Sequence, residues 1–517
     1  MDLARQLGGA APLLQNVGAS GQGVRAHVLD TEIDVNHPAF QNPPPLIHGP
    51  YNPGGPVHGT ASYGICFANW PTNPQVTGML PEREQGIFAQ YTQLSWFGGP
   101  NPFLVFLLQA TDPAGPYRSV LVSCGVGSVQ VAGYTTIAAE TDFALFIADV
   151  LMTQSISNTG SHLARPQAWA KNVVAVGGII HQNTLTRADD TAGNAALGPA
   201  ADGRVKPDLA HIQDGVLTTW TSSPPPGYTQ FSGTSASTPI TAGYFGLIFQ
   251  LWHREAFRGF GGGATVFADR PHAATIRALA FNAAYRYDWL AGGPNASIIR
   301  NVQGWGMIDA GNLYSLRDRL FIVNETDPVS QGQTRAYSIR VSPGEPMLAA
   351  TMVYNDPPGT PAALHARVND LSLRLTAPDG ASYWGNNGLW SGNTSTPGGS
   401  ANTIDTTENV FLPNPAPGVW RVEVIASEVV QDARLEDPEV NADFALVVSG
   451  VSPSVSCYAN CDNSTAPPVL NVNDFICFQQ KYAAGSLYAN CDGSTTAPAL
   501  NINDFICFQQ QFAAGCP

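Results

Sequence analysis

The segment Phe231-Ser-Gly-Thr-Ser-Ala-Ser-Thr-Pro239 stands directly before a largely apolar stretch, residues 240–252, which is long enough to form a buried helix. Upstream, apolar runs such as residues 24–29 and 172–180 do not alternate with polar residues. That pattern is typical of parallel strands that are buried on both faces, and helical stretches separate the runs. Residues 1–318 therefore predict an α/β unit built on a parallel sheet.

Polar residues mark the ends of the predicted elements in this unit. Asp30 ends an apolar run, His58 opens His-Gly-Thr-Ala-Ser-Tyr, and Ser235 precedes the apolar helix. Open α/β sheets place their ligand crevices at such strand ends and helix starts. A serine hydroxyl is a poor nucleophile unless a base takes its proton, and the base needs an acid to orient it and to stabilise its cation. Ser235, His58 and Asp30 can supply these three roles.

At these positions the sequence resembles the subtilase family of serine peptidases, whose catalytic residues follow the order Asp, His, Ser. The resemblance covers roughly residues 15–315. The matching motifs are Leu29-Asp30-Thr31, His58-Gly59-Thr60, Gly233-Thr234-Ser235 with Pro239, Thr77-Gly78-Met79-Leu80-Pro81-Glu82, Ser157-Asn158-Thr159-Gly160 and Asp202-Gly203-Arg204-Val205-Lys206-Pro207-Asp208. This resemblance implies a subtilisin-like catalytic domain over residues 1–318 and a serine endopeptidase that works through an acyl-enzyme intermediate.

The same resemblance assigns further roles. Asn158 matches the asparagine whose amide, together with the backbone N–H of the nucleophile, holds the oxyanion. The edge strand that pairs with the substrate and forms one wall of the primary specificity pocket corresponds to Ser123, Cys124, Gly125, Val126 and Gly127. The sequence departs from the family at Glu32, Ser157 and Ala236, where the family usually has Gly, Gly and Met. These changes affect local turns and remove an oxidisable thioether, and we expect catalysis to survive them.

Residues 319–450 contain short alternating runs that are separated by turn signals such as Pro378-Asp-Gly. This pattern predicts an antiparallel β-sandwich. The segment resembles the jelly-roll-like β-domain that follows the catalytic domain in some bacterial subtilases, where it mainly stabilises the enzyme and in some cases holds calcium. Asp356 and Asp370 are either calcium ligands or, as loop carboxylates more often are, caps of turns.

The last segment, residues 456–517, holds six of the eight cysteines and a repeat with a period of 30 residues that starts at Tyr458 and Tyr488. A small module so dense in cysteine is typical of a disulfide-stapled, exported domain. The alternative is a zinc site, but the usual C-x₂-C spacing is missing. Each repeat is predicted to be an oxygen-rich loop followed by a short helix.

The repeats resemble dockerin modules, whose paired loops bind Ca²⁺ through Asp and Asn oxygens. The candidate ligands are Asn460, Asp462, Ser464, Asn471 and Asp474 in the first repeat and Asn490, Asp492, Ser494, Asn501 and Asp504 in the second. Each loop is longer than the standard one, and Pro468 and Pro498 stand where Gly would ease the turn. A module held by disulfides alone is therefore the alternative to a structural Ca²⁺ site. The chemistry itself requires no cofactor.

Composition limits the partners. The net charge is −15 and only Lys171, Lys206 and Lys481 are lysines, so binding to nucleic acid or anionic lipid through a basic surface is not expected. No apolar run is long enough for a membrane span. We expect protein or peptide substrates, and a surface or protein anchor bound by the tail. We also expect a secreted or cell-surface bacterial protein whose signal peptide and prosegment are not present in this chain.

Two other classes of function were weighed. An α/β-hydrolase esterase needs Gly-x-Ser-x-Gly and the order Ser, Asp, His, whereas here His58 precedes Ser235. A catalytically inactive surface binding protein on a peptidase scaffold is the remaining alternative to an active enzyme. Reaction with a fluorophosphonate separates that alternative from an active peptidase, because only an activated serine reacts.

Overall fold

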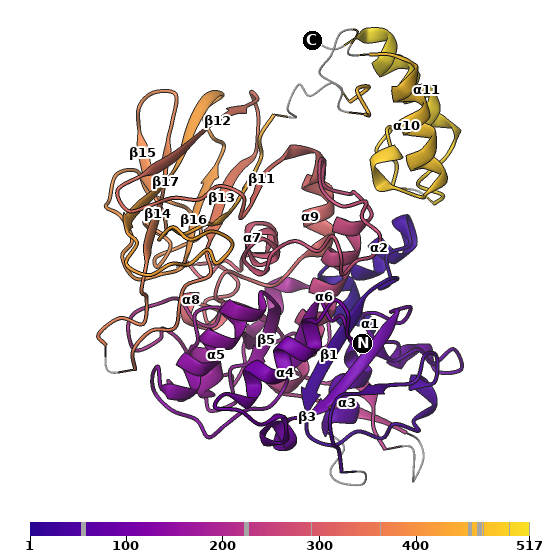
Figure 1. Ribbon diagram of the computed structural model, residues 1–517, viewed down its shortest axis with the longest axis vertical. Coiled ribbons are helices and arrows are strands. Elements are labelled where there is room, and N and C mark those ends of the chain that lie inside the picture. The colour runs from indigo at the N-terminus through magenta and orange to yellow at the C-terminus, as the bar shows by residue number, and fades with distance from the viewer. Residues whose placement is uncertain are drawn as a thin grey trace.

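A computed structural model describes residues 1–52, 58–221, 227–290, 292–361, 363–452, 458–462, 468, 470–495 and 497–515. Figure 1 shows three parts, which are an α/β body, a β-sandwich beside it and a small helical tail. The tail, with α10 and α11, lies next to the α2 and α9 end of the body.

The body is built around a mainly parallel sheet. In the described residues this sheet has eight strands in the order β2-β3-β1-β4-β5-β6-β7, with β8 also paired to β6. All pairs are parallel except β6 with β7. The strands are β1 Arg25–Asp30, β2 Leu46–Ile47, β3 Gln85–Gln90, β4 Leu121–Cys124, β5 Leu151–Ser155, β6 Val174–Ile180, β7 Thr191–Ala192 and β8 Leu209–Ile212. A separate hairpin joins β9 Val216–Thr219 to β10 Tyr228–Phe231. The predicted α/β class of the body is confirmed.

Helices cover the sheet. They are α1 Asp2–Leu7, α2 Ala10–Val17, α3 His58–Phe67, α4 Pro102–Thr111, α5 Thr136–Ala148, α6 Thr234–His253, α7 Ala273–Ala283, α8 Arg300–Gln303 and α9 Ala310–Leu316. The central helix α6 packs on β4, β5, β6 and β8. Nearly all of its side chains are buried, which explains why the sequence of this helix is apolar on every side.

The sandwich has two antiparallel sheets in its described part, β11-β18-β13-β16 and β12-β17-β14-β15. The strands are β11 Leu320–Asn324, β12 Thr334–Val341, β13 Met347–Val353, β14 Asp370–Thr376, β15 Ser382–Trp384, β16 Thr407–Pro413, β17 Gly418–Glu428 and β18 Ala445–Ser449. An apolar core between the sheets includes Leu373, Trp420 and Val448. The predicted antiparallel β-structure is therefore present, while its assignment as a jelly roll stays a prediction.

A buried polar network joins the sandwich to the body. The ammonium of Lys171 pairs with Asp356 of the sandwich and also donates to the carbonyl of Ala366 at 2.8 Å. Asn172 exchanges two hydrogen bonds with the backbone of Asp356. Both side chains of the Lys171–Asp356 pair are fully buried. Such a pair costs much when one partner is removed, because the other charge then stays buried alone.

The tail contains α10 Val472–Ala483 and α11 Ile502–Ala514. Each helix begins with a capping box, in which Asn471 or Asn501 is the cap and the aspartate three residues later closes the box. Disulfides join Cys461 to Cys477 and Cys491 to Cys507, so the two repeats are stapled in the same way. The tail contacts the body through the Lys481–Glu255 ion pair. The other two tail cysteines, Cys457 and Cys516, lie outside the described residues.

Candidate active site

Asp30 and His58 form a hydrogen-bonded pair at the carboxyl end of the sheet. Asp30 is the last residue of β1 and His58 is the first residue of α3. The distance between His58 Nδ1 and Asp30 Oδ1 is 2.6 Å, and the Asp30 side chain is fully buried while 28% of the His58 side chain is exposed. Thr31 N–H donates to the same Oδ1 at 2.7 Å. The carboxylate therefore fixes the imidazole with its other nitrogen, Nε2, available for proton transfer.

The electrostatic setting of His58 suits a general base. Burial lowers its pKa, but the charge of Asp30 and the hydrogen bond to it outweigh that effect, so the pKa lies above its ordinary value of 6.5. The positive charge of Arg165 acts in the opposite direction. The ring of Phe231 contacts His58 edge-on, with the ring centroids 5.0 Å apart.

Ser235 lies in the first turn of α6, after the N-cap residue Gly233, whose φ of 87° favours glycine. Its Oγ donates a hydrogen bond to the carbonyl oxygen of Gly125 at 3.2 Å. A Cβ placed on Gly125 would lie 2.7 Å from Asp30 Oδ2 and 3.5 Å from His58 Cε1. Gly125 thus lies against both members of the pair and contacts the serine as well, which brings the three predicted catalytic residues to one place. Nucleophile–base hydrogen bonds are often long or misdirected until a substrate binds.

Asn158 lies beside the start of the same helix. Its Oδ1 accepts hydrogen bonds from the N–H of Thr234 at 2.8 Å and from the hydroxyl of Thr234 at 3.1 Å. A Cβ on Gly233 would come within 3.0 Å of Asn158 Nδ2. Because the carbonyl end of the amide is fixed on Thr234, the NH₂ end is the part that can donate to an oxyanion next to Ser235.

The predicted substrate strand divides into two parts. Ser123 and Cys124 are buried within β4, with 1% and 0% of their surface exposed, so their side chains cannot line an open binding groove. Burial raises the pKa of the Cys124 thiol to about 12, which leaves it unreactive. The stretch from Gly125 through Val126 to Gly127 follows the strand beside Ser235 and is the part in position to meet a substrate.

The sequence did not single out Arg165, which also lies at this strand. Its Nη1 donates to the carbonyl oxygens of Gly127 at 2.8 Å and Ser128 at 3.0 Å. It belongs to no recognisable motif and is separated from Gly127 by helix α5, strand β5 and the loops around them, so no sequence signal could have revealed the contact.

The candidate calcium ligands of the tail are placed only in part, because Ser464 lies outside the described residues. In the first repeat, the carboxylate of Asp474 accepts the N–H groups of Asp462 at 3.3 Å and Asn471 at 2.8 Å. Asn460 lies next to Cys461 at the start of that loop.

In the second repeat the same backbone contacts to the aspartate recur. Asp504 is buried and accepts the N–H groups of Asp492 at 3.2 Å and Asn501 at 2.7 Å. Burial, together with the neighbouring Asp492, raises the pKa of Asp504 despite these hydrogen bonds. Asn490 donates to the carbonyl of Ser494, while its buried Oδ1 has no hydrogen-bond partner in the described part of the chain. Two neighbouring carboxylates and an amide oxygen from the same repeat are ligand types that Ca²⁺ takes.

In the sandwich, the two carboxylates that the sequence suggested as calcium ligands have partners within the protein. Asp356 pairs with Lys171 and accepts the N–H groups of Val368 and Asn369. Asp370 lies 3.6 Å from the guanidinium of Arg367. Both are therefore engaged in ion pairs.

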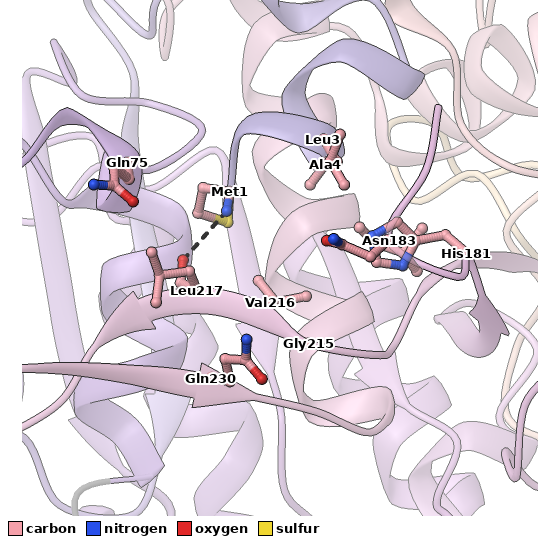
Figure 2. A pocket seen from close by; sticks show the side chains of 11 residues that line it. Met1, Leu3, Ala4, Gln75, His181, Asn183, Gly215, Val216, Leu217 and Gln230 are labelled. Atoms are coloured by element: carbon pink, nitrogen blue, oxygen red, sulfur yellow. Dashed lines mark hydrogen bonds between the residues drawn. The ribbon is translucent and has the colours of Figure 1, made fainter. Parts of the chain in front are cut away.

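A cavity of about 260 Å³ opens where α1 meets the β9–β10 hairpin. Figure 2 shows Met1, whose amine donates to the carbonyl of Leu217 at 3.3 Å, and His181 and Asn183 on the opposite side. Its lining includes none of Asp30, His58, Asn158 and Ser235, so it is separate from the candidate active site.

Part of the chain is similar in sequence to known proteins. Residues 119–306, which carry Asn158 and Ser235, match the model of the subtilase family. Membrane-bound transcription factor site-1 protease of Mus musculus is 26% identical over 249 residues, which is 46% of this chain and 22% of that protein. The human protein of the same name is 25% identical over the same length. The match thus spans about a fifth of the length of these relatives.

Solved structures that resemble the chain include the self-cleaved protease domain of PatA and Sphericase. Both are 19% identical to this chain, with TM-scores of 0.41. The match with PatA covers 58% of this chain and 98% of that structure. The match with Sphericase covers 56% of this chain and 92% of that structure. Among the described residues, no helix has both the length and the apolar character that crossing a membrane would require.

Proposed function

We propose that the chain is a serine endopeptidase that hydrolyses protein substrates through an acyl-enzyme. The observation that carries this proposal is the buried Asp30–His58 pair together with Ser235, whose hydroxyl contacts the same glycine that lies against that pair. The subtilase match over residues 119–306 supports it.

In this mechanism His58 Nε2 takes the proton of the Ser235 hydroxyl as the oxygen attacks the scissile carbonyl. Asp30 holds the tautomer of His58 and stabilises the imidazolium. The developing oxyanion accepts hydrogen bonds from Asn158 Nδ2 and from the N–H of Ser235. His58 then protonates the leaving amine, and water repeats the sequence to release the acid.

The test is hydrolysis of casein by a Ser235→Ala variant, with Ser315→Ala as the matched control. Ser315 is an exposed serine on α9 whose hydroxyl donates to the carbonyl of Asn312 in its own helix. We expect Ser235→Ala to lose nearly all activity and Ser315→Ala to keep that of the parent. A Ser235→Ala variant as fast as the parent would overturn the proposal, and a parent without activity would favour an inactive binding protein.

We place the protein outside the cell, at a surface to which the tail attaches it. Two disulfides within a short module support an oxidising compartment. The tail also exposes aliphatic side chains at equivalent positions of both repeats: Val472, Ile476, Ile502 and Ile506. Exposed apolar patches of this kind mark contact surfaces, and a protein partner is the expected occupant.

We further propose that the second repeat binds Ca²⁺ through the carboxylates of Asp492 and Asp504 and the side-chain oxygen Oδ1 of Asn490. The ion would neutralise the two carboxylates, and the catalytic steps do not involve it. Adding Ca²⁺ to the chelated protein should raise the melting temperature of the tail, measured by calorimetry. The Asp492→Asn variant should lose most of this rise, whereas Asp379→Asn, at an exposed turn of the sandwich, should keep it. If Ca²⁺ does not shift the transition, the tail is held by its disulfides alone.

A further inference from the structure

In the family that the chain resembles, the side chain of the acylated substrate residue lies against the strand that corresponds to residues 123–127, and Arg165 contacts this stretch at Gly127. The backbone N–H of Arg165 donates to the carbonyl of Ile156, two residues before Asn158, at 3.0 Å. Its guanidinium reaches the carbonyl oxygens of Gly127 and Ser128. The arginine therefore connects the segment that carries the oxyanion donor to the strand that lies beside Ser235.

These two segments are also joined to each other directly. Val131 and Ala164 exchange two backbone hydrogen bonds, at 2.8 and 3.0 Å. Gln130 donates from its side-chain amide to Ser157 Oγ at 3.2 Å.

The charge of Arg165 has no counter-ion within the described residues. Among these residues its guanidinium donates to two neutral carbonyl oxygens, and its Nε is buried without a hydrogen-bond partner. In a chain with 39 acidic and 24 basic residues, an arginine without a carboxylate partner is unusual at Gly127, two residues after the glycine that Ser235 contacts. Only part of the Arg165 side chain is exposed, so its field is weakly screened by solvent.

From this geometry we infer that Arg165 selects substrates with an acidic side chain, Glu or Asp, at the residue whose carbonyl is attacked. The guanidinium donors that are not used by Gly127 and Ser128 bind the substrate carboxylate, because arginine is suited to carboxylates and the site offers no competing anion. This inference rests on the proposed peptidase function and adds its substrate class. Arg165 is a specificity residue and takes no part in proton transfer.

The test compares three peptide p-nitroanilides that differ only at the last residue, which is Glu, Gln or Leu. Glu and Gln have nearly the same shape, so the ratio of their kcat/KM values measures the charge effect alone. We expect the parent to prefer Glu over Gln by about 10- to 100-fold, the range for a charge-assisted hydrogen bond in a partly buried pocket. High salt should reduce the ratio.

Variants then assign the preference to one residue. Arg165→Gln should reduce kcat/KM for the Glu substrate by at least 10-fold and change that for Gln by less than about 3-fold. Arg165→Lys should restore part of the preference. The matched control is Arg340→Gln, which removes an exposed arginine of β12 in the sandwich and should leave the ratio unchanged.

The outcomes separate this inference from the proposed function. The first outcome is that a fluorophosphonate labels Ser235 while cleavage prefers Leu or does not distinguish Glu from Gln. This result overturns the inference about Arg165 but leaves the proposed peptidase function standing. Better cleavage of Leu peptides by Arg165→Gln than by the parent would mean that the arginine only blocks the pocket, and this also overturns it. Absence of labelling and of cleavage overturns both. The parent's Glu-to-Gln ratio decides the matter even if a variant fails to fold.

Discussion

His58 is the residue whose surroundings determine the rate of the proposed reaction. Its Nδ1 is held 2.6 Å from the buried carboxylate of Asp30, which raises its pKa against the opposing effect of burial. Above this raised pKa the imidazole is neutral and can accept the serine proton. The rate of acylation should therefore rise with pH and level off above the pKa of His58.

Replacing Asp30 by Asn tests this arrangement. The change keeps the shape of the side chain but removes its charge and can impose the wrong tautomer on His58, so kcat should fall by about 10⁴-fold. The acid limb of the kcat/KM profile should move to lower pH, because the pKa of His58 loses the factor that raises it. The measurement is a pH profile with a peptide substrate. An unchanged acid limb would show that Asp30 does not govern His58.

Asn158 should act only when charge develops on the substrate oxygen. An Asn158→Ala variant removes one donor, and we expect kcat to fall by about 10²- to 10³-fold with little change in KM. Because Oδ1 also holds Thr234, the melting temperature of the variant is measured in parallel. A fall in activity that only follows a loss of folded protein would assign Asn158 a structural role.

At the scale of elements, titratable groups gather at the junction of α7 with β11. His272 Nδ1 lies 2.7 Å from Asp149, and Glu325 and Asp443 approach the same place from the sandwich. Burial and the charges of Glu436 and Asp149 raise the pKa of Asp443 to about 7. Burial raises the pKa of Glu325 as well, and its carboxylate neighbours add to the effect.

The sign of the stability effect follows from these shifts. A carboxyl whose pKa is higher in the folded state favours folding while it is protonated, and this contribution is lost as the pH rises through the folded pKa. We expect an Asp443→Asn variant to match the parent in melting temperature at pH 4. It should exceed the parent at pH 8. An identical pH dependence of both proteins in thermal melts would show that Asp443 does not titrate near 7.

The sequence predicted elements better than their contacts. The unbroken apolar runs indicated the parallel sheet and the all-round apolar helix α6, because full burial leaves that pattern in the sequence itself. The sequence also indicated Asp30, His58 and Ser235 as candidate catalytic residues, since polar residues at strand ends and helix starts stand out from an apolar background. Arg165 and the pairing of Lys171 with Asp356 could not be predicted, because these contacts join segments far apart in the chain.

On the scale of the whole molecule, the body and the sandwich should unfold together. Lys171 and Asp356 are buried in the interface between them, so an Asp356→Ala variant leaves a lysine buried without its partner and should lose about 3–5 kcal/mol of stability. Calorimetry should show one transition for both parts in the parent. The control is Glu439→Gln, at an exposed site of the sandwich. Two separate transitions in the parent would show that the interface does not couple them.

Labelling with a fluorophosphonate, followed by mass spectrometry of the digested protein, is the most direct test of the central claim. The proposed mechanism predicts one label per chain, attached to Ser235, and loss of the label in a His58→Ala variant, since the serine then has no base. No labelling of the folded parent protein, or a label on another serine with Ser235 unmodified, would contradict the assignment of Ser235 as the activated nucleophile.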